Sequence, residues 1–444
     1  MAASSLKRIR AASLWCSANS TTVRSDATTH TKAHWASGQL RSVARSSHVW
    51  PLPLPGTGTV RSRAITILLK EAATAMPIES NISPEARAVL KALAVRKNVI
   101  IAGPPGTGKS RLLNEVRELF KWDQGQTGSA PTGRIPIPAS SGPIPDWFPS
   151  PSQDVSREVF QTVFDQNTKY RDFMRGLVPK IGQAGAFEVT SGTLHRAALK
   201  AGHDGNATLV LVDEINRGPA VAAFGSALVG LEADKRLPTD RKPTSTTQFF
   251  EILGDTGSHE SFALPNDLYI LAAMNEADTS VEPLDVAFLR RFHIHRLEPD
   301  ESVLRAHFGL GAAVPLTDIP SRATDYYEAL AQSFQRINEQ ILLGRGQAYQ
   351  LGHGALMHAP ADLVNIGAAQ EYVATAWATL RGHVDEVFYG NTRAISDVLR
   401  AENTKSPYSL RESTFAGQTV RRITGPLRPD SAELYRLLRL IGTE

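Results

Sequence analysis

The feature that most constrains the fold is a short glycine-rich segment between a predicted strand and a predicted helix. The apolar run NVIIA, residues 98–102, is followed at once by GPPGTGKS, residues 103–110, and then by the helical stretch RLLNEVRELF. In this order the loop's backbone N–H groups and the helix N-terminus face the same point, which makes a phosphate-binding loop. We therefore expect an α/β fold whose parallel strands present a nucleotide at their carboxyl ends.

The residues of this loop suit particular parts of a nucleotide. Its glycines let the backbone curl around the phosphates, Lys109 reaches the β and γ oxygens, and the Ser110 hydroxyl is offered to Mg²⁺. A glycine turn that matches by chance is the simpler alternative, but the strand before it and the helix after it argue against that. The predicted nucleotide-binding residues are Gly103, Pro104, Pro105, Gly106, Thr107, Gly108, Lys109 and Ser110.

A second predicted strand ends in two acids. The stretch ATLVLVDEINRG, residues 207–218, places Asp213 and Glu214 directly after an apolar run. We expect Asp213 to hold the Mg²⁺ shell and Glu214 to polarise the water that attacks the γ-phosphate. Two solvated acids at a strand end are the alternative, and the upstream phosphate loop favours the catalytic pair. Arg217, just beyond, is a candidate to act across a subunit interface.

A third strand, in LYILAAMNEADTS (residues 268–280), ends in polar side chains. If it lies between the other two, Asn275 points at the γ-phosphate, where an amide can donate to a phosphate oxygen and accept from water. Asp278 is open between capping a turn and reading the base. The adjacent Arg290 and Arg291 follow, placed to reach a nucleotide on a neighbouring subunit.

Charge is uneven along the chain. Residues 1–75 hold ten basic and two acidic side chains, a net +8, so the remainder carries −4 of the chain's +4. The basic balance therefore does not predict a nucleic-acid surface on the folded part. The leader has three open interpretations: upstream sequence translated from a start codon set before Met76, a disordered arm, or a transit peptide.

Other segments set the organisation. The apolar runs have only strand length, which excludes a membrane span, and the single Cys16 excludes a disulfide framework and favours a cytoplasmic protein. Pro- and Gly-rich residues 131–152 form a surface excursion in which Trp147 and Phe148 pin the loop or touch a partner. Two further segments are predicted to be hairpins or loops that could line a pore: GLVPKIGQAGAFEV and TSTTQFFEILGDTGSHESFALP. From residue 299 apolar residues recur at helical spacing, which predicts a helical lid domain with Trp377 in its core. The last 45 residues are expected to be a loose tail that ends in a short helix, which either packs on the lid or binds a partner.

These motifs together resemble the AAA+ superfamily, and within it the McrB-type branch related to dynein and MoxR proteins. The similar segments are YRDFMRGLVPKI, FEVTSGTLHRAALKA, VDEINRG, LYILAAMNEADTSVEPLDVAFLRRF and YQLGHGALM. The resemblance implies a ring, expected to be a hexamer, an ATP substrate with Mg²⁺, and a McrC-like nuclease partner through which DNA would be engaged and cut.

Two departures qualify that resemblance. Glu276 stands where the family has Thr, which favours ATP over the GTP used by the founding restriction protein. The lid segment reads Gly352-His353-Gly354 without the family's aromatic residue, and His353 either senses nucleotide or is a hydrogen-bonded structural residue.

The expected fold is a parallel five-stranded sheet sandwiched by helices, with a helical lid. The expected divisions are a leader (1–75), an AAA+ core (76–298), a lid (299–400) and a tail (401–444). The expected function is the ATP-hydrolysing motor of a McrBC-like restriction system. The alternatives are a MoxR-type ATPase that remodels protein complexes and a slow nucleotide-gated scaffold.

Overall fold

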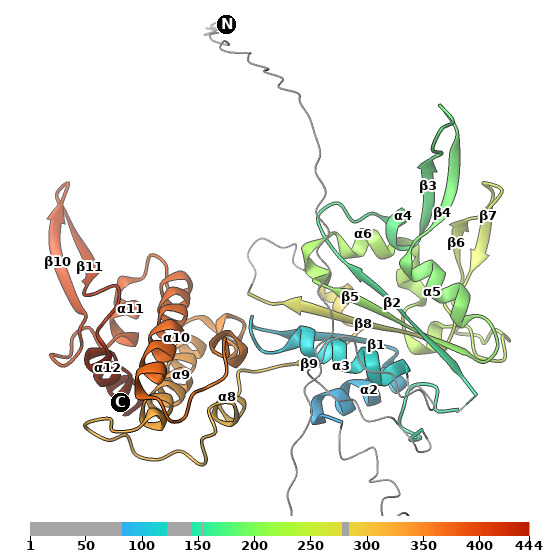
Figure 1. The fold of residues 1–444 in the computed structure, drawn as a ribbon. Coiled ribbons are helices and arrows are strands. Elements are labelled where there is room, and N and C mark those ends of the chain that lie inside the picture. The colour runs from blue at the N-terminus through green and yellow to red at the C-terminus, as the bar shows by residue number, and fades with distance from the viewer. Residues whose placement is uncertain (1–81, 122–143, 153, 278–283, 444) are drawn as a thin grey trace, which may run out of the picture. The chain divides into compact units, whose positions relative to one another are not determined.

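A five-stranded sheet forms the centre of the computed structural model, which describes residues 82–121, 144–152, 154–277 and 284–443. All neighbouring strands of this sheet run parallel. In spatial order they are β2 (Ser156–Val163), β5 (Asn206–Asp213), β8 (Leu268–Asn275), β1 (Asn98–Gly103) and β9 (His293–Arg296) (Figure 1). The predicted parallel sheet is confirmed, and so is the place of β8 between the phosphate-loop strand and the strand that ends in Asp213.

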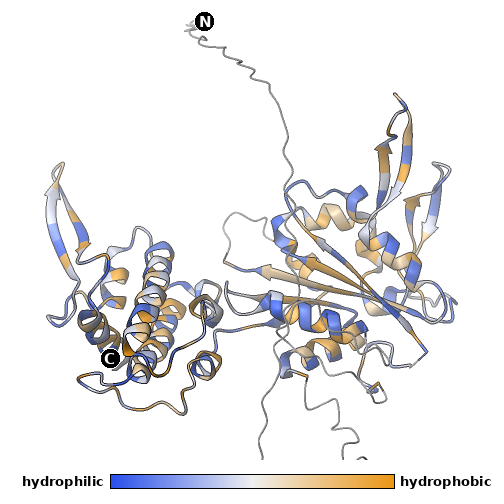
Figure 2. Ribbon diagram, in the orientation of Figure 1, coloured by the Kyte–Doolittle hydropathy of each residue, from blue (hydrophilic) through white to orange (hydrophobic). Residues whose placement is uncertain are grey.

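Helices cover both faces of the sheet. They are α2 (Pro84–Arg96) and α3 (Lys109–Lys121) on one face, and α5 (Thr193–Ala201) and α6 (Ala220–Phe224) on the other. Alternate residues of β1 enter different cores: Val99 and Ile101 pack with α2 and α3, whereas Ile100 and Ala102 pack with α5 and α6. A strand buried on both faces must be apolar throughout, as the orange central strands in Figure 2 show.

Local signals set the ends of α2. The Ser83 hydroxyl accepts a hydrogen bond from the Ala86 N–H, and Pro84 occupies the first turn, where its missing N–H costs nothing. The helix ends at Arg96 because Lys97 adopts a left-handed φ of 65°. The cap at one end and the backbone turn at the other therefore set both ends of this helix.

Two hairpins extend from the α/β part near α4 (Tyr170–Phe173). They pair β3 (Arg175–Pro179) with β4 (Phe187–Ser191) and β6 (Phe250–Leu253) with β7 (His259–Phe262). An ion pair between Arg175 and Asp255 links one hairpin to the other. Both segments were expected to be hairpins or loops, and both are hairpins; a pore-lining role stays a prediction.

Short elements complete this part. They are α7 (Val286–Leu289) and the 3₁₀ helices Ile215–Arg217, Gly225–Gly230 and Ala233–Lys235; two more 3₁₀ helices, Gln347–Tyr349 and His353–Leu356, lie in the C-terminal part. Phe148 is buried against Phe120 and pins the chain after residue 143, as expected. The leader with Cys16, residues 131–143 of the proline-rich excursion and Asp278 lie outside the described residues.

The C-terminal part is helical. Its helices are α8 (Glu301–His307), α9 (Ala323–Arg345), α10 (Ile366–Val387), α11 (Thr392–Val398) and α12 (Ser431–Thr443). They share one apolar core, in which Trp377 is 2% exposed as expected. Leu434, Leu437 and Leu438 of α12 belong to this core, so the last helix packs on the lid rather than standing free for a partner. No helix among the described residues is long and apolar enough to cross a bilayer.

The expectation of a loose tail before α12 is wrong. Residues Ser409–Phe415 (β10) and Gln418–Thr424 (β11) form an antiparallel hairpin. Ala416 and Gly417 make the connecting two-residue turn, and both have positive φ, of 50° and 79°. That is the turn type whose twist matches a hairpin, and Ala at its first position hides it from a search for Asn-Gly or Asp-Gly.

Candidate active site

The phosphate loop lies between β1 and α3, and its backbone requires glycine. Gly106 and Gly108 have φ values of 80° and 89°, in the left-handed region that other residues rarely adopt. At Gly103 a Cβ atom would lie 2.4 Å from the carbonyl oxygen of Leu297, the residue after β9, so there is no room for a side chain there. Backbone conformation and close packing therefore account for three of the loop's glycines.

Lys109 folds back over this loop. Its Nζ donates to the carbonyl oxygens of Gly103 (2.9 Å) and Pro104 (2.8 Å). Burial lowers the pKa of Lys109 to about 8, although the carboxylates of Glu214, Asp213 and Glu276 oppose that shift. The ammonium group is thus partly desolvated and hydrogen-bonded to neutral carbonyl oxygens. A phosphate would replace these carbonyls and bring a full negative charge to the ammonium group.

The two acids after β5 are held differently. Asp213 accepts the backbone N–H of Glu214 through Oδ1 (3.0 Å). Glu214 has a left-handed φ of 53°, unusual for a residue with a side chain, which turns the chain sharply at the end of the strand. Its carboxylate accepts from Asn275 Nδ2 at 3.1 and 3.3 Å. The structure thus brings together Glu214 and Asn275, two residues that are 61 positions apart.

Two further contacts position this pair. Arg217 Nε lies 3.3 Å from Glu214 Oε2, so Arg217 contacts the glutamate of its own chain. Asn216 Nδ2 donates to the Asn275 carbonyl oxygen (2.8 Å) and fixes the end of β8. Sequence reasoning missed both contacts. The spacing of three residues between Glu214 and Arg217 is the one signal in the sequence that could have indicated a local ion pair.

The predicted Mg²⁺ ligands fit a hard cation. Ser110 is exposed at the start of α3, and Asp213 keeps Oδ2 free of hydrogen bonds to described residues. The described chain holds no cluster of three or more His, Cys, Asp or Glu residues that could cage a metal alone. One hydroxyl and one carboxylate suit Mg²⁺, because this ion takes its other ligands from nucleotide phosphates and water.

Beside Asn275, Glu276 forms an ion pair with Arg296 at the end of β9, with Oε1 3.0 Å from the guanidinium. The residue that departs from the family pattern therefore has a partner on the far side of β1. Sequence reasoning did not find that partner.

The two adjacent arginines separate clearly. Arg291 donates to the carbonyl oxygens of Leu228 (3.0 Å) and Ala287, and its Nε lies 4.0 Å from Glu232. Arg290 is exposed, and its guanidinium has no hydrogen bond or ion pair with any described residue. Arg291 is thus engaged within its own chain, whereas the Arg290 guanidinium has no partner among the described residues.

The lid segment touches the phosphate loop directly. Gly352 N donates to Pro105 O and Gly354 N to Gly106 O, both at 2.8 Å. A Cβ atom at Gly352 would lie 2.0 Å from the Gly106 carbonyl carbon. His353 accepts the Asp300 N–H through Nδ1 (3.2 Å), and burial lowers its pKa, which supports the structural role among its two interpretations. Paired glycines were the sequence signal of this close approach.

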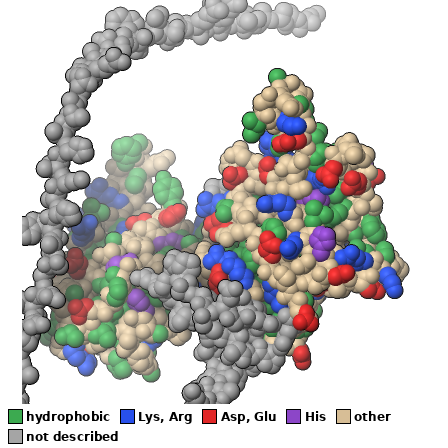
Figure 3. Space-filling view, turned by 45° about the vertical axis from the view of Figure 1, so that its right-hand side comes forward, with side chains coloured by type: hydrophobic (Ala, Val, Ile, Leu, Met, Phe, Trp, Pro, Cys, Tyr) green, Lys and Arg blue, Asp and Glu red, His purple; other side chains and the backbone are tan. Residues whose placement is uncertain are grey.

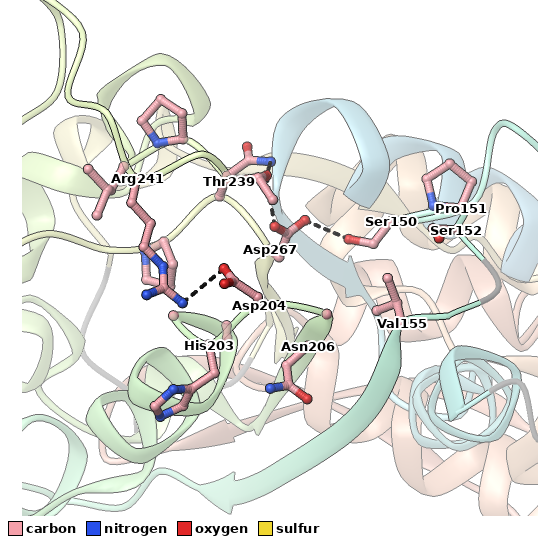
Figure 4. Close-up of a pocket in the computed structure, with 17 residues that line it drawn as sticks. Ser150, Pro151, Ser152, Val155, His203, Asp204, Asn206, Thr239, Arg241 and Asp267 are labelled. Atoms are coloured by element: carbon pink, nitrogen blue, oxygen red, sulfur yellow. Dashed lines mark hydrogen bonds and ion pairs between the residues drawn. The ribbon is translucent and has the colours of Figure 1, made fainter.

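A pocket at the opposite, amino edge of the sheet encloses about 290 Å³ (Figure 4). Asp267 accepts from the hydroxyls of Ser150 (2.7 Å) and Thr239 (2.9 Å), and Arg241 pairs with Asp204. Asp267, Asp204 and Arg241 are thus already engaged, and the pocket lies away from the phosphate loop, so the candidate chemistry belongs to the carboxyl edge.

The strand order, the phosphate loop and the Glu214–Asn275 pair define an AAA-type P-loop nucleotide-binding protein. Residues 152–292 match the family described as the AAA domain of the dynein-related subfamily. The chain therefore contains a dynein-related AAA domain and is a distant homologue of McrB-type restriction components.

Two curated relatives support that statement. The chain is 26% identical over 274 residues to the "Type IV methyl-directed restriction enzyme EcoKMcrB subunit" of Escherichia coli (strain K12), covering 60% of this chain and 48% of that protein. It is 29% identical over 219 residues to the "Type II restriction enzyme BsuMI component YdiS" of Bacillus subtilis (strain 168), covering 46% and 58%. The chain thus spans about half the length of the relatives it matches.

Solved structures are more distant. A putative ATPase from Cytophaga hutchinsonii aligns over 76% of this chain and 84% of its own, with 14% identity and a TM-score of 0.28. PCH-2 of C. elegans aligns over 66% of each chain, with 13% identity and a TM-score of 0.29. The fold class rests on the strand order and not on these superpositions.

The first prediction concerns Gly352. Gly352→Ala forces the lid segment away from the phosphate loop, because the new Cβ would overlap the Gly106 backbone. We expect the affinity for nucleotide, measured by titration calorimetry, to fall about tenfold, or 1.4 kcal/mol. Gly382→Ala in α10 is the matched control, since nothing lies within 4 Å of its Cβ position. Equal affinities for Gly352→Ala and the parent would contradict the role of this contact.

The second prediction concerns pH. Free Lys109, with a pKa of about 8, must be protonated to pair with phosphate, and that pairing raises its pKa in the complex. Above pH 8 binding therefore takes up a proton, and affinity falls as pH rises, by at most about tenfold per pH unit. Calorimetry in buffers of different ionisation enthalpy counts that proton. Lys109→Ala should bind weakly and lose the uptake; uptake that persists in this variant would assign it to another group.

Proposed function

We propose that this protein is an Mg²⁺-dependent ATPase that works as a ring, expected to be a hexamer, and is the motor subunit of a McrBC-like restriction system. The observation that carries the catalytic part is the hydrogen bond between Asn275 and Glu214 at the open edge of the phosphate loop. A cytoplasmic location is part of this proposal.

The chemistry follows from the roles of the residues. Lys109 would exchange its carbonyl partners for the β and γ oxygens, and Ser110 and Asp213 would hold Mg²⁺, which neutralises charge on the phosphates. Glu214 and Asn275 would orient a water whose oxygen attacks the γ-phosphorus as the bond to the bridging oxygen breaks. ADP leaves, and Glu214 accepts the proton of the attacking water.

Glu214 is restrained before that step. Asn275 and Arg217 both contact its carboxylate, at 3.1 and 3.3 Å, and both contacts hold the carboxylate in one orientation. When a water enters, it competes with these partners for the carboxylate oxygens. The same contacts that orient Glu214 therefore also limit when it can act.

Glu276 supports ATP as the substrate. It adds a carboxylate near Lys109, in place of the Thr of the resembling family, and is tied to Arg296. This departure from the motif linked to GTP use is the reason for preferring ATP.

A ring is proposed because one exposed arginine of the α/β part has no partner among the described residues. Arg290 is exposed and unengaged in the described chain, whereas Arg291 is bound to its own subunit. A guanidinium from a neighbour can stabilise charge on the transferring phosphoryl group. Movement of the lid, residues 299–400 in this proposal, would follow from its hydrogen bonds to the phosphate loop.

The macromolecular substrate is argued from the relatives. Both curated relatives are named as components of restriction enzymes, which favours DNA and a McrC-type nuclease as partner. A remodelling ATPase would instead be stimulated by a protein client.

The third prediction tests hydrolysis. Glu214→Gln should keep nucleotide binding and lower kcat by about 10²–10⁴-fold, because the general base is lost while the shape is kept. Turnover of ATP and GTP is measured with and without duplex DNA. We expect ATP to be preferred and DNA to stimulate the parent. Hydrolysis by Glu214→Gln at the parent's rate would sink the catalytic assignment, and stimulation by protein alone would favour remodelling.

The fourth prediction tests action between subunits. Arg290→Ala should lower kcat about 10³-fold or more with little effect on the monomer fold. Mixing Arg290→Ala with Glu214→Gln should restore part of the activity, because one subunit supplies Glu214 and its neighbour supplies Arg290. If the two variants co-assemble and no activity returns, Arg290 does not act across the interface. Arg291→Ala serves as the comparison. Because Arg291 is bound within its own chain, this variant should lower the free energy of unfolding more than Arg290→Ala does.

A further inference from the structure

The hairpin β10–β11 extends from the helical part and is unexplained by nucleotide chemistry (Figure 1). Its root is anchored: Ile423 packs against the helical core, and Tyr408 just before β10 is buried and accepts a hydrogen bond from Trp377 Nε1 (3.3 Å). Beyond that root, residues 411–422 are all exposed. A two-stranded ribbon has little stability of its own, so an exposed one fixed at its root is expected to serve contact rather than packing.

The pairing register sorts the side chains onto two faces, because directly opposed residues share a face. On one face Glu412 lies opposite Arg421 and forms an ion pair with it (2.6 Å). On the other face Arg411 lies directly opposite Arg422. The guanidinium groups of these two arginines have no ion pair or hydrogen bond with any described residue. We call the face that bears Arg411 and Arg422 the arginine face.

This like-charge pair has a cost. Like charges directly opposed across a ribbon destabilise it, and here no carboxylate offsets the repulsion. The only acid of the hairpin, Glu412, is on the other face. An anion between the two guanidinium groups would remove the repulsion, and a phosphate offers oxygens that each group can bind through paired N–H donors.

The rest of the arginine face suits the same ligand. Ser413 and Gln418 add polar donors, and Phe415 at the tip is 76% exposed. Arginine and glutamine can also bind base edges, and Phe can contact a thymine methyl group. Residues 405–428 hold five basic side chains and one acid, whereas the chain beyond residue 75 is net acidic. On the α/β face seen in Figure 3, basic and acidic side chains are interspersed instead.

The ribbon also has the right size. Two paired strands lie about 5 Å apart, and a major groove about 12 Å wide admits a two-stranded ribbon. We propose that the hairpin β10–β11 binds duplex DNA in the major groove through its arginine face, with Arg411 and Arg422 on phosphate. This adds a direct DNA contact on the chain itself, and it names the substrate class of the proposed function without depending on hydrolysis.

The fifth prediction tests this contact with the full chain carrying Glu214→Gln, so that a failure of catalysis cannot be mistaken for a failure of binding. Arg411→Gln/Arg422→Gln removes two phosphate contacts. We expect affinity for a 30-base-pair duplex to fall about tenfold and the slope of log K against log salt to decrease by about 2. The basic leader contributes the same background to each variant, so the differences report the hairpin.

The matched control is Glu412→Gln/Arg421→Gln, which alters the opposite face and leaves net charge unchanged. It should bind DNA as the parent does. Arg411→Gln/Arg422→Gln removes a repulsion and should keep the parent's melting temperature, so lost binding would not reflect unfolding. A photo-crosslinking residue at Phe415 should attach to the duplex and stop doing so when the two arginines are replaced.

Three results would overturn the proposal. The first is an unchanged affinity and salt slope in Arg411→Gln/Arg422→Gln, together with no crosslink from position 415. The second is an equal loss in the control variant. The third is tighter hairpin-dependent binding to single strands than to duplex, which excludes the groove. A crosslink from position 415 to a protein partner but not to DNA would make the hairpin a protein-docking element.

Discussion

The candidate active site depends on the insertion of β8, parallel, between β1 and β5. The register pairs Asn275 with Gly103, so the end of β8 lies beside the first residue of the phosphate loop. At the other end of these strands, the buried guanidinium of Arg236 donates to Asn98 Oδ1 (2.6 Å) and to the carbonyl oxygens of Leu231 and Leu268. Burial lowers the pKa of Arg236 to about 9, yet this network ties the amino ends of β1 and β8 and so sets the alignment of their carboxyl ends.

The phosphate loop is shaped by what its carbonyl groups contact. Gly103 and Pro104 oxygens accept from Lys109, and Pro105 and Gly106 oxygens accept from the lid glycines. Four consecutive carbonyl groups of the loop thus accept hydrogen bonds. On nucleotide binding Lys109 would leave its two, while the two lid contacts can remain. The lid is therefore joined to the loop through peptide groups. No side-chain atom makes these hydrogen bonds, but a Cβ atom added at Gly352 would push the two segments apart.

The sequence predicted the parts of this protein that depend on local patterns. Apolar runs ending in Asp213 or Asn275 and the spacing of loop glycines depend on strand burial and backbone geometry, so the sheet and the phosphate loop could be expected from residues alone. The links from Glu276 to Arg296 and from Gly352 to the loop join segments that are distant in sequence, and no periodic pattern encodes them. The hairpin was missed for another reason. Its turn begins with Ala416, and its strands show no regular alternation of apolar and polar residues.

The packing of α12 on α9 has a consequence for biosynthesis. The strands and helices of the α/β part are complete in the chain by Arg296, whereas the helical core still lacks Leu437 and Leu438 until α12 has been made. Because domains fold largely as units during synthesis, the nucleotide-binding sheet can form while the lid's apolar core remains open. For the time needed to translate more than a hundred further residues, the nascent chain would expose the α9 surface that α12 later covers, and this is the stage at which it is most exposed to aggregation.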